Sequence, residues 1–313
     1  METRNEEEVI SRLVVESKDI ETVFKHELYW RVDWHKSLPY LVFICQKPFK
    51  PSGKDKEKTV FEKLEDQHTY KNTFNEQLAE YHSPEIYLYN YESKTLFNLE
   101  DPLSELDPTI AVFCQEAQAL DLFLQGYKKE AFRRGYMFCF NRKSSIFRLN
   151  IALEKEGNET PVESPSSIKK LAVCKKTNLT PDFFSSHSPF LAPSNETLYF
   201  CSQPQKFVEH NSSYHLYSLN LKTQKISELI GTVRKPSSTF VGLNQNIFLH
   251  SQRHFLHNGK FLLFTSQVEN SCEVFLLDLR IVIRNEASNK SESKTQISKR
   301  VHWFALQLER LPI

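Results

Sequence analysis

Two short sequence units recur along the 313-residue chain, and they constrain its fold more than any other feature. The first unit is a polar tight turn followed by a strand that carries an apolar run, as in "DWHKSLPYLVFIC", "FLAPSNETLYFCS" and "FLHNGKFLLFTS". The second is a strand, a polar turn and another strand, as in "IYLYNYESKTLFNL", "HLYSLNLKTQKISEL" and, more loosely, "IFRLNIALEKEG". Taken in that order, the two units predict a four-stranded antiparallel sheet.

The spacing of the first unit predicts how these sheets are arranged. Its centres lie near residues 42, 123, 199 and 263 and are about 64 to 81 residues apart. Four-stranded sheets that repeat radially are the blades of a β-propeller. The chain is therefore expected to be all-β, a partial β-propeller of about four four-stranded antiparallel blades with a short N-terminal helix.

Apolar and aromatic runs, several with period-two alternation, mark the expected strands. An imperfect stripe that includes Ile10, Leu13 and Val14 predicts an N-terminal helical segment over residues 1–27, and the propeller fragment follows over 28–313. Polar composition predicts exposed or disordered inserts at 47–58, 154–167 and 284–300. The expected strands are 41–45, 85–91, 109–114, 120–125, 136–140, 145–151, 197–202, 214–221, 246–251, 261–266, 273–279 and 303–308.

Amino-acid composition disfavours several classes of protein. With 40% hydrophobic and 25% charged residues the chain can bury a sizeable core, and a net charge of +1 disfavours a nucleic-acid binder. No apolar run approaches the length of a membrane-spanning helix, and the acidic N-terminus has no signal-peptide core. We expect a cytoplasmic protein whose scattered cysteines are mostly buried free thiols: Cys45, Cys114, Cys139, Cys174, Cys201 and Cys272.

Several groups of residues could form a metal site or a catalytic site, but a structural explanation is favoured for each group. His250, His254 and His257 would share one helix face and could hold a metal, but the repeat places His257 in a tight turn. No serine lies in a recognisable nucleophile motif. We therefore expect no catalytic, cofactor-binding or metal-binding residues in this chain. Polar turns and packing account for the remaining groups, which are Glu65–Asp66, Glu100–Asp101, Lys128–Lys129 with Arg133–Arg134, Trp30, Trp34 and Trp303. The four basic residues are also candidates for lining a loop at a propeller mouth or at a domain interface.

The segment "LDLFLQGYKKEAFRRGYMFCFNRKSSIFRLNI" (120–151) resembles the N-terminal propeller of the acylaminoacyl peptidase (acylamino-acid-releasing enzyme) family, within the prolyl oligopeptidase superfamily. Colinear stretches at 33–47, 83–101, 185–200 and 261–279 extend the resemblance over roughly residues 28 to 280. The chain departs from the family at 70–78, "YKNTFNEQL", where an acidic-Trp-Gly element is usual. The matching positions are Gly135, Phe138, Cys139, Asn141, Arg142 and Ser144.

The resemblance implies a function for the complete enzyme rather than for this chain alone. Family members are serine omega-peptidases that remove N-acylated, typically acetylated, amino acids from short blocked peptides. Their propeller gates access and contributes to homo-oligomer contacts. None of the seven glycines is placed for a G-x-S-x-G elbow, so we expect the C-terminal α/β-hydrolase domain to be absent and the chain alone to be inactive. The alternative is a stand-alone propeller that serves as an interaction module, with neither nucleic acid nor membrane as a partner.

The stretch "GYMFCFNRKSSIFRLNI" (135–151) raises one further question, because its polar break carries Arg142 and Lys143. Alternating apolar residues on both sides predict two strands, 136–140 and 145–151, joined by a hairpin loop. A loop tip of this kind is solvated. The basic pair is therefore expected to need no ligand.

Overall fold

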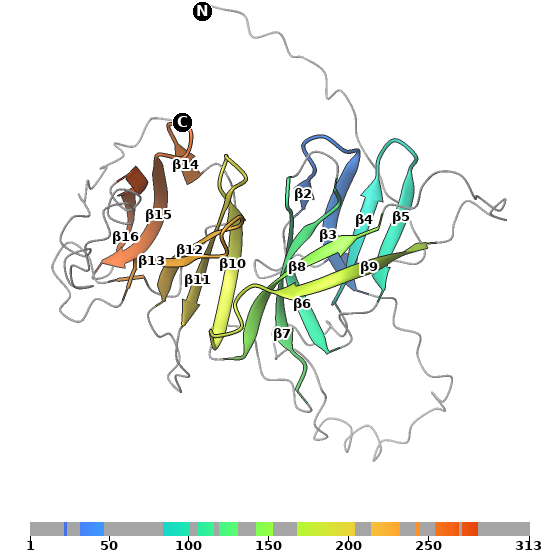
Figure 1. Cartoon of the computed structure of the whole chain (residues 1–313), viewed down its shortest axis with the longest axis horizontal. Helices are drawn as coiled ribbons and strands as arrows, with labels where there is room; N and C mark the ends of the chain where they lie inside the picture. The colour runs from blue at the N-terminus through green and yellow to red at the C-terminus, as the bar shows by residue number, and fades with distance from the viewer. Residues whose placement is uncertain are drawn as a thin grey trace, which may run out of the picture.

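The computed structural model describes residues 22–23, 32–46, 84–100, 105–115, 119–130, 142–152, 168–203, 214–231, 242–243, 254–268 and 271–280. Within these ranges nearly all regular structure is β-strand, which confirms the all-β prediction (Figure 1). No helix in this part of the chain is long and apolar enough to cross a membrane.

The strands form four antiparallel meanders in chain order, because within each meander successive strands from β2 onward pair with each other, while β1 pairs with β3 as β2 does. The repeated units predict this order. The first meander contains β1 (Thr22–Val23), β2 (Asp33–Trp34), β3 (Tyr40–Gln46), β4 (Pro84–Asn90) and β5 (Thr95–Glu100); the second contains β6 (Leu106–Phe113), β7 (Leu122–Lys128), β8 (Ser144–Ile151) and β9 (Lys169–Asn178); the third contains β10 (Ser185–Leu191), β11 (Thr197–Gln203), β12 (His215–Asn220) and β13 (Ile226–Ile230); the fourth contains β14 (Phe255–Leu256), β15 (Phe261–Val268) and β16 (Ser271–Asp278).

Two contacts between the meanders are made by backbone pairing. The long strand β9 pairs in parallel with β5 through residues 169–172, and from Val173 onward it pairs antiparallel with β8. Ser185 at the start of β10 pairs with Ser144 at the start of β8. The first three meanders are therefore joined by hydrogen-bonded strands as well as by packing.

The turns of the second sequence unit repeat the same geometry in the first and third meanders. The side-chain oxygen of Asn90 accepts hydrogen bonds from the backbone N–H groups of Glu92 and Ser93. Asn220 does the same for Lys222 and Thr223. Four residues after each asparagine the backbone is left-handed, at Lys94 (φ 55°) and Gln224 (φ 58°). The sequence repeat thus corresponds to a repeated turn structure.

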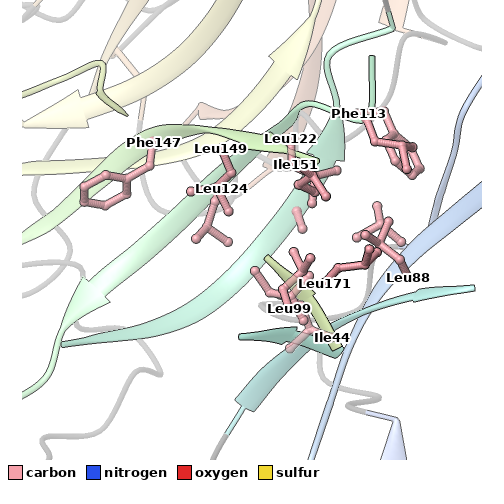
Figure 2. Close-up of a cluster of buried hydrophobic side chains, with 14 of the residues drawn as sticks. Ile44, Leu88, Leu99, Phe113, Leu122, Leu124, Phe147, Leu149, Ile151 and Leu171 are labelled. Carbon is pink, nitrogen blue, oxygen red and sulfur yellow. The ribbon is translucent and has the colours of Figure 1, made fainter. Parts of the chain in front are cut away.

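Most of the hydrophobic core lies in apolar layers between successive meanders, and a further cluster that includes Leu41, Phe43 and Tyr87 lies on the other face of the first meander. Alternation along β7 shows how they form, since Leu122 and Leu124 face the first meander while Phe123 faces the third. A further layer lies between the third and fourth meanders and contains Phe190, Leu216 and Phe264. Figure 2 shows the layer between the first two meanders, with side chains from both sheets pointing toward each other. Stacked sheets with one core layer per interface are what the predicted blade repeat requires.

Two predictions about local structure are wrong. Thr22 and Val23 fall in the segment expected to be helical, yet they form a short strand paired with the end of β3. Both residues are β-branched and favour extended backbone. In addition, β8 has β7 and β9 as its antiparallel partners, so its hairpin partner is β7 and not the segment 136–140.

Several predictions fall on parts of the chain that the structure does not describe. These are the remainder of the helical segment 1–27 apart from Thr22–Val23, the strands 136–140, 246–251 and 303–308, and the inserts 47–58, 154–167 and 284–300.

Candidate interaction surface

One end of the four meanders is built from equivalent turns, which we call the turn face. It comprises the turns between β2 and β3 (35–39), between β6 and β7 (around Gln115), between β10 and β11 (192–196) and between β14 and β15 (257–260). These turns lie along the upper edge of the view in Figure 1. The turn face is therefore a continuous surface made by the first sequence unit.

Gln115 connects three of these turns through hydrogen bonds. Its side-chain oxygen accepts from the backbone N–H of Lys36 at 2.8 Å, and its side-chain nitrogen donates to the carbonyl of Trp34 at 2.9 Å. Its own carbonyl accepts a hydrogen bond from the side-chain amide of Asn195 at 3.3 Å. The fourth turn is also close, since a Cβ added to Gly259 would lie 3.5 Å from Cδ of Pro193.

The first turn, 35–39, is also stabilised by hydrogen bonds inside the turn and by a hydrogen bond between β2 and β6. Nδ1 of His35 accepts hydrogen bonds from the backbone N–H groups of Ser37 and Leu38. The carboxylate of Asp33 accepts from the backbone N–H of Phe113 at 2.8 Å. With these contacts fixed, the surface around Trp34 is preorganised, which reduces the conformational entropy that binding a partner would cost.

Large apolar side chains are exposed beside the turns of this face. Val32 and Trp34 come just before 35–39 and Leu256 just before 257–260, while the N–H of Tyr91 donates to the carbonyl of Pro39. Val32, Trp34, Tyr91 and Leu256 are 43%, 54%, 38% and 38% exposed, and no other large hydrophobic residue in the described ranges is as open. The rings of Trp34 and Tyr91 are 5.9 Å apart. This corrects the prediction that Trp34 is a packing residue. Because β2 is only two residues long and ends the sheet beside a turn, its tryptophan projects into solvent.

A serine and a histidine are adjacent inside the molecule, but their environment does not suit nucleophilic catalysis. Nδ1 of His187 lies 3.2 Å from Oγ of Ser188, and both residues are buried. The backbone of Ser188 is left-handed (φ 54°) within an irregularity of β10, and its N–H donates to the side chain of Gln125. The ring of His187 packs edge-on against Tyr214. A substrate carbonyl has no access to this pair, so the cluster is structural.

Two charged clusters lie on the sheets, the first of them at the end of the turn around Gln115, and each has hydrogen-bond partners among its neighbours. Asp121 accepts hydrogen bonds from Nε and a terminal nitrogen of Arg148 and from Asn150, at 2.6 to 3.0 Å. Glu228 bonds to His215 at 2.8 Å and to Tyr217 at 3.2 Å. Burial and the negative charge of Glu228 raise the pKa of the Tyr217 phenol, which therefore stays protonated as a donor.

The histidines do not gather as a metal site in the part of the chain that the structure describes. His257 has a left-handed backbone (φ 49°) in the turn that joins β14 and β15, as the repeat predicts, so it is not on a helix with His254. His250 lies outside the described residues. Across the described ranges no three His, Cys, Asp or Glu side chains converge to hold a metal ion.

The charged residues and tryptophans singled out in the sequence differ in where the structure places them. Arg142 is buried, at 7% exposure, and not at a solvated loop tip, which corrects the prediction for this residue. It lies close enough to Tyr127 for its charge to lower that phenol's pKa, although burial raises it more. Lys128, Lys129 and Lys143 are exposed. The side chains of Glu65, Asp66, Glu100, Asp101, Arg133, Arg134, Trp30 and Trp303 lie outside what the structure describes.

The cysteines largely follow the prediction. Cys45, Cys114 and Cys201 are buried and form no disulfide, Cys174 is exposed, and the side chains of Cys139 and Cys272 lie outside what the structure describes. Burial raises the pKa of the Cys201 thiol to about 12 and that of Cys45 further, the latter helped by Glu85. Buried thiols of this kind are inert packing residues.

Comparison with known proteins complements this geometry. No curated protein matches the chain. Solved structures to which the chain is similar include TolB from Acinetobacter baumannii (12% identity, TM-score 0.41, covering 79% of this chain and 40% of that one). The tricorn protease is another (10% identity, TM-score 0.40, 77% and 20%), so the chain spans less than half of either structure. A family model described as "Acylamino-acid-releasing enzyme, N-terminal domain" matches residues 9–306. The chain therefore belongs to the family of acylamino-acid-releasing enzyme N-terminal domains.

Proposed function

We propose that this chain is the propeller portion of a serine peptidase that removes N-acylated amino acids from short blocked peptides. The observation that carries the proposal is the match to the family's N-terminal domain over residues 9–306. In this proposal the four stacked meanders are the blades of a partial propeller, and any helical part of the N-terminal segment is limited to residues before Thr22. The propeller restricts entry to short or unfolded peptides and contributes contacts between copies of the enzyme.

The division of labour follows from what the described side chains do. They build core layers between sheets, repeated turns and a preorganised turn face. The one close serine–histidine pair described above, Ser188 and His187, is buried. The serine, histidine and aspartate that perform hydrolysis are therefore proposed to come from an α/β-hydrolase domain, with this chain acting on access alone. The proposed compartment is the cytoplasm, where the free thiols of Cys45, Cys114 and Cys201 would stay reduced.

Two measurements test this proposal. The purified chain, incubated with an acetyl-alanine chromogenic amide, should release no chromophore. Mixed with a separately expressed hydrolase domain from a family member, it should form a complex on gel filtration and slow cleavage of a long N-acetylated peptide more than cleavage of a dipeptide. Turnover by the chain alone that a serine-directed phosphonate abolishes would contradict the non-catalytic role. Equal slowing of both substrates would contradict the gating role.

A second candidate is a stand-alone interaction module, which the exposed apolar residues of the turn face favour. Trp34 and Tyr91 form an aromatic pair that nothing in the described structure covers. Aromatic residues of this kind often dominate the energetics of protein interfaces. A photo-crosslinking amino acid at position 34 separates the two candidates, because it would capture the hydrolase domain only if that domain docks on the turn face. Failure of the hydrolase domain to bind the chain at all would favour the stand-alone module.

A further inference from the structure

Within the described ranges, no strand pairs with part of one edge of β9, the outer strand of the second meander. Its first residues pair with β5, and this pairing ends where Glu100 lies opposite Ala172. From Val173 to Asn178 the described partner is β8, on the other edge. Cys174, Lys175, Lys176 and Asn178 are exposed, so the second half of β9 is accessible to solvent. An accessible strand edge presents backbone N–H and C=O groups to a further strand.

This strand is strongly basic. It contains Lys169, Lys170, Lys175 and Lys176 and no acidic residue. Of these, Lys170, Lys175 and Lys176 are exposed. The whole chain is almost neutral, at +1, so the positive charge of β9 is a local feature rather than a consequence of composition. It creates a positive potential along the open edge.

A bulge divides β9 and places the lysines on both faces. Asn150 lies opposite Lys175 while Ile151 lies opposite Val173, so Cys174 is the extra residue of a β-bulge. Beyond the bulge, Lys176 lies over the ring of Phe147, at 5.7 Å from the ring centroid. Lys175, the next residue along the strand, points to the opposite face. A strand added at this edge would therefore meet one lysine on each face.

These features select one kind of partner. A second copy of β9 would bring lysines opposite lysines, and like charges directly across a ladder are destabilising. An extended segment with neighbouring Asp or Glu residues would place one carboxylate on each face, opposite the two lysines, while its backbone pairs with the open edge. We infer that the edge of β9 from Val173 to Asn178 binds an extended acidic peptide segment by strand addition.

Fluorescence anisotropy with the full chain tests the inference. The probe is a fluorescein-labelled extended peptide whose central positions are adjacent Asp and Glu residues between Val and Thr. The double variant Lys175→Glu, Lys176→Glu should weaken binding by at least about tenfold. The matched control, Lys222→Glu with Lys225→Glu in the exposed β12–β13 turn, removes the same charge elsewhere and should change the affinity by less than about twofold. Thermal unfolding of both double variants checks that each is folded.

Two further probes separate strand addition from simple charge attraction. A peptide of identical sequence, N-methylated at alternate residues, keeps its charge but cannot donate ladder hydrogen bonds, and it should bind at least about tenfold more weakly. A charge-swapped peptide with Lys in place of Asp and Glu should bind the Lys175→Glu, Lys176→Glu variant and not the natural chain. Equal binding of the methylated peptide would overturn strand addition. Tighter binding of a single-stranded oligonucleotide of equal charge would overturn the peptide as partner, and equal losses in the two double variants would overturn the site.

Discussion

At the scale of single residues, some buried polar groups are held by several close partners. Asp121 is the clearest case, because one of its carboxylate oxygens accepts three hydrogen bonds, two of them from Arg148. The acid is nearly buried, whereas the arginine side chain is 25% exposed. Removal of the acid would leave a guanidinium that is only partly able to reach water, so the acid stabilises the fold through its donors.

Substitution of Asp121 by Ala should therefore lower the free energy of unfolding by about 2 kcal/mol. This is below the loss expected for a fully buried pair because water screens the exposed part of Arg148. Urea unfolding followed by tryptophan fluorescence measures the change. The control is Asp182→Ala, which removes an exposed carboxylate near β9 and should change stability by less than about 0.5 kcal/mol. Similar losses in the two variants would show that the Asp121 network contributes nothing specific.

Thiol reactivity should follow burial. Only the thiolate reacts, and Cys201, with its pKa raised to about 12, holds its proton at both pH 7 and pH 9. Cys174 is exposed. We expect iodoacetamide at pH 8 to modify Cys174 in the native chain within minutes and to modify Cys45 and Cys201 only in denaturant, as mapped by mass spectrometry. Rapid native modification of Cys201 would mean that β11 opens locally.

At the scale of elements, the turns of the second sequence unit carry the repeat. Gln224 adopts a left-handed backbone, which costs a non-glycine residue about 1 kcal/mol. Asn220 stabilises the same turn by accepting two backbone hydrogen bonds. The backbone of Gln224 thus strains the turn, whereas the side chain of Asn220 stabilises it. The two residues can be substituted separately.

Replacement of Gln224 by Gly should stabilise the chain by up to about 1 kcal/mol, since glycine adopts this backbone without strain. The matched control is the neighbouring Lys225→Gly, where the backbone is not left-handed and the added freedom of the unfolded chain should destabilise instead. Thermal denaturation of both variants gives opposite shifts in midpoint. Shifts of the same sign would contradict the turn geometry.

Sequence patterns identify the strands whose buried side chains are apolar. The strands β3, β4, β11 and β15 read directly as aromatic and aliphatic runs. By contrast β9 is rich in lysine because it is an exposed edge, and β10 begins "SSHS" because the hydroxyls of Ser185 and Ser186 bond to those of Ser144 and Ser202. Neither has the apolar alternation that marks a strand.

Single residues at sheet ends were harder still to predict. The burial of Arg142 depends on which strands flank β8, and the exposure of Trp34 depends on how short β2 is. Both are properties of tertiary pairing rather than of local sequence. The turn face could be anticipated in part, because its turns repeat in the sequence. The hydrogen bonds through which Gln115 connects these turns could not, because they link residues about 80 positions apart.

At the scale of the whole molecule, stability depends on the layers between meanders. Phe123 is fully buried in the layer that joins the second and third meanders. Its replacement by Ala should cost about 3 to 5 kcal/mol, enough to approach the total stability of a typical domain. The control is Leu256→Ala on the turn face, where the side chain is exposed and the cost should be below about 1 kcal/mol. Hydrogen exchange should lose protection in both β8 and β11 of the Phe123 variant, and loss in only one would mean that the meanders unfold independently.

The parallel pairing of β5 with β9 has a consequence for biosynthesis. Phe97 meets its partner Lys169 only after about 70 further residues have been made. While the ribosome translates that stretch, the first meander has left the exit tunnel with its last strand uncovered along one side. A nascent chain in this state is exposed to misassociation with its neighbours on the same messenger. The lysine-rich strand that finally closes the gap thus sets the moment at which the first sheet is complete.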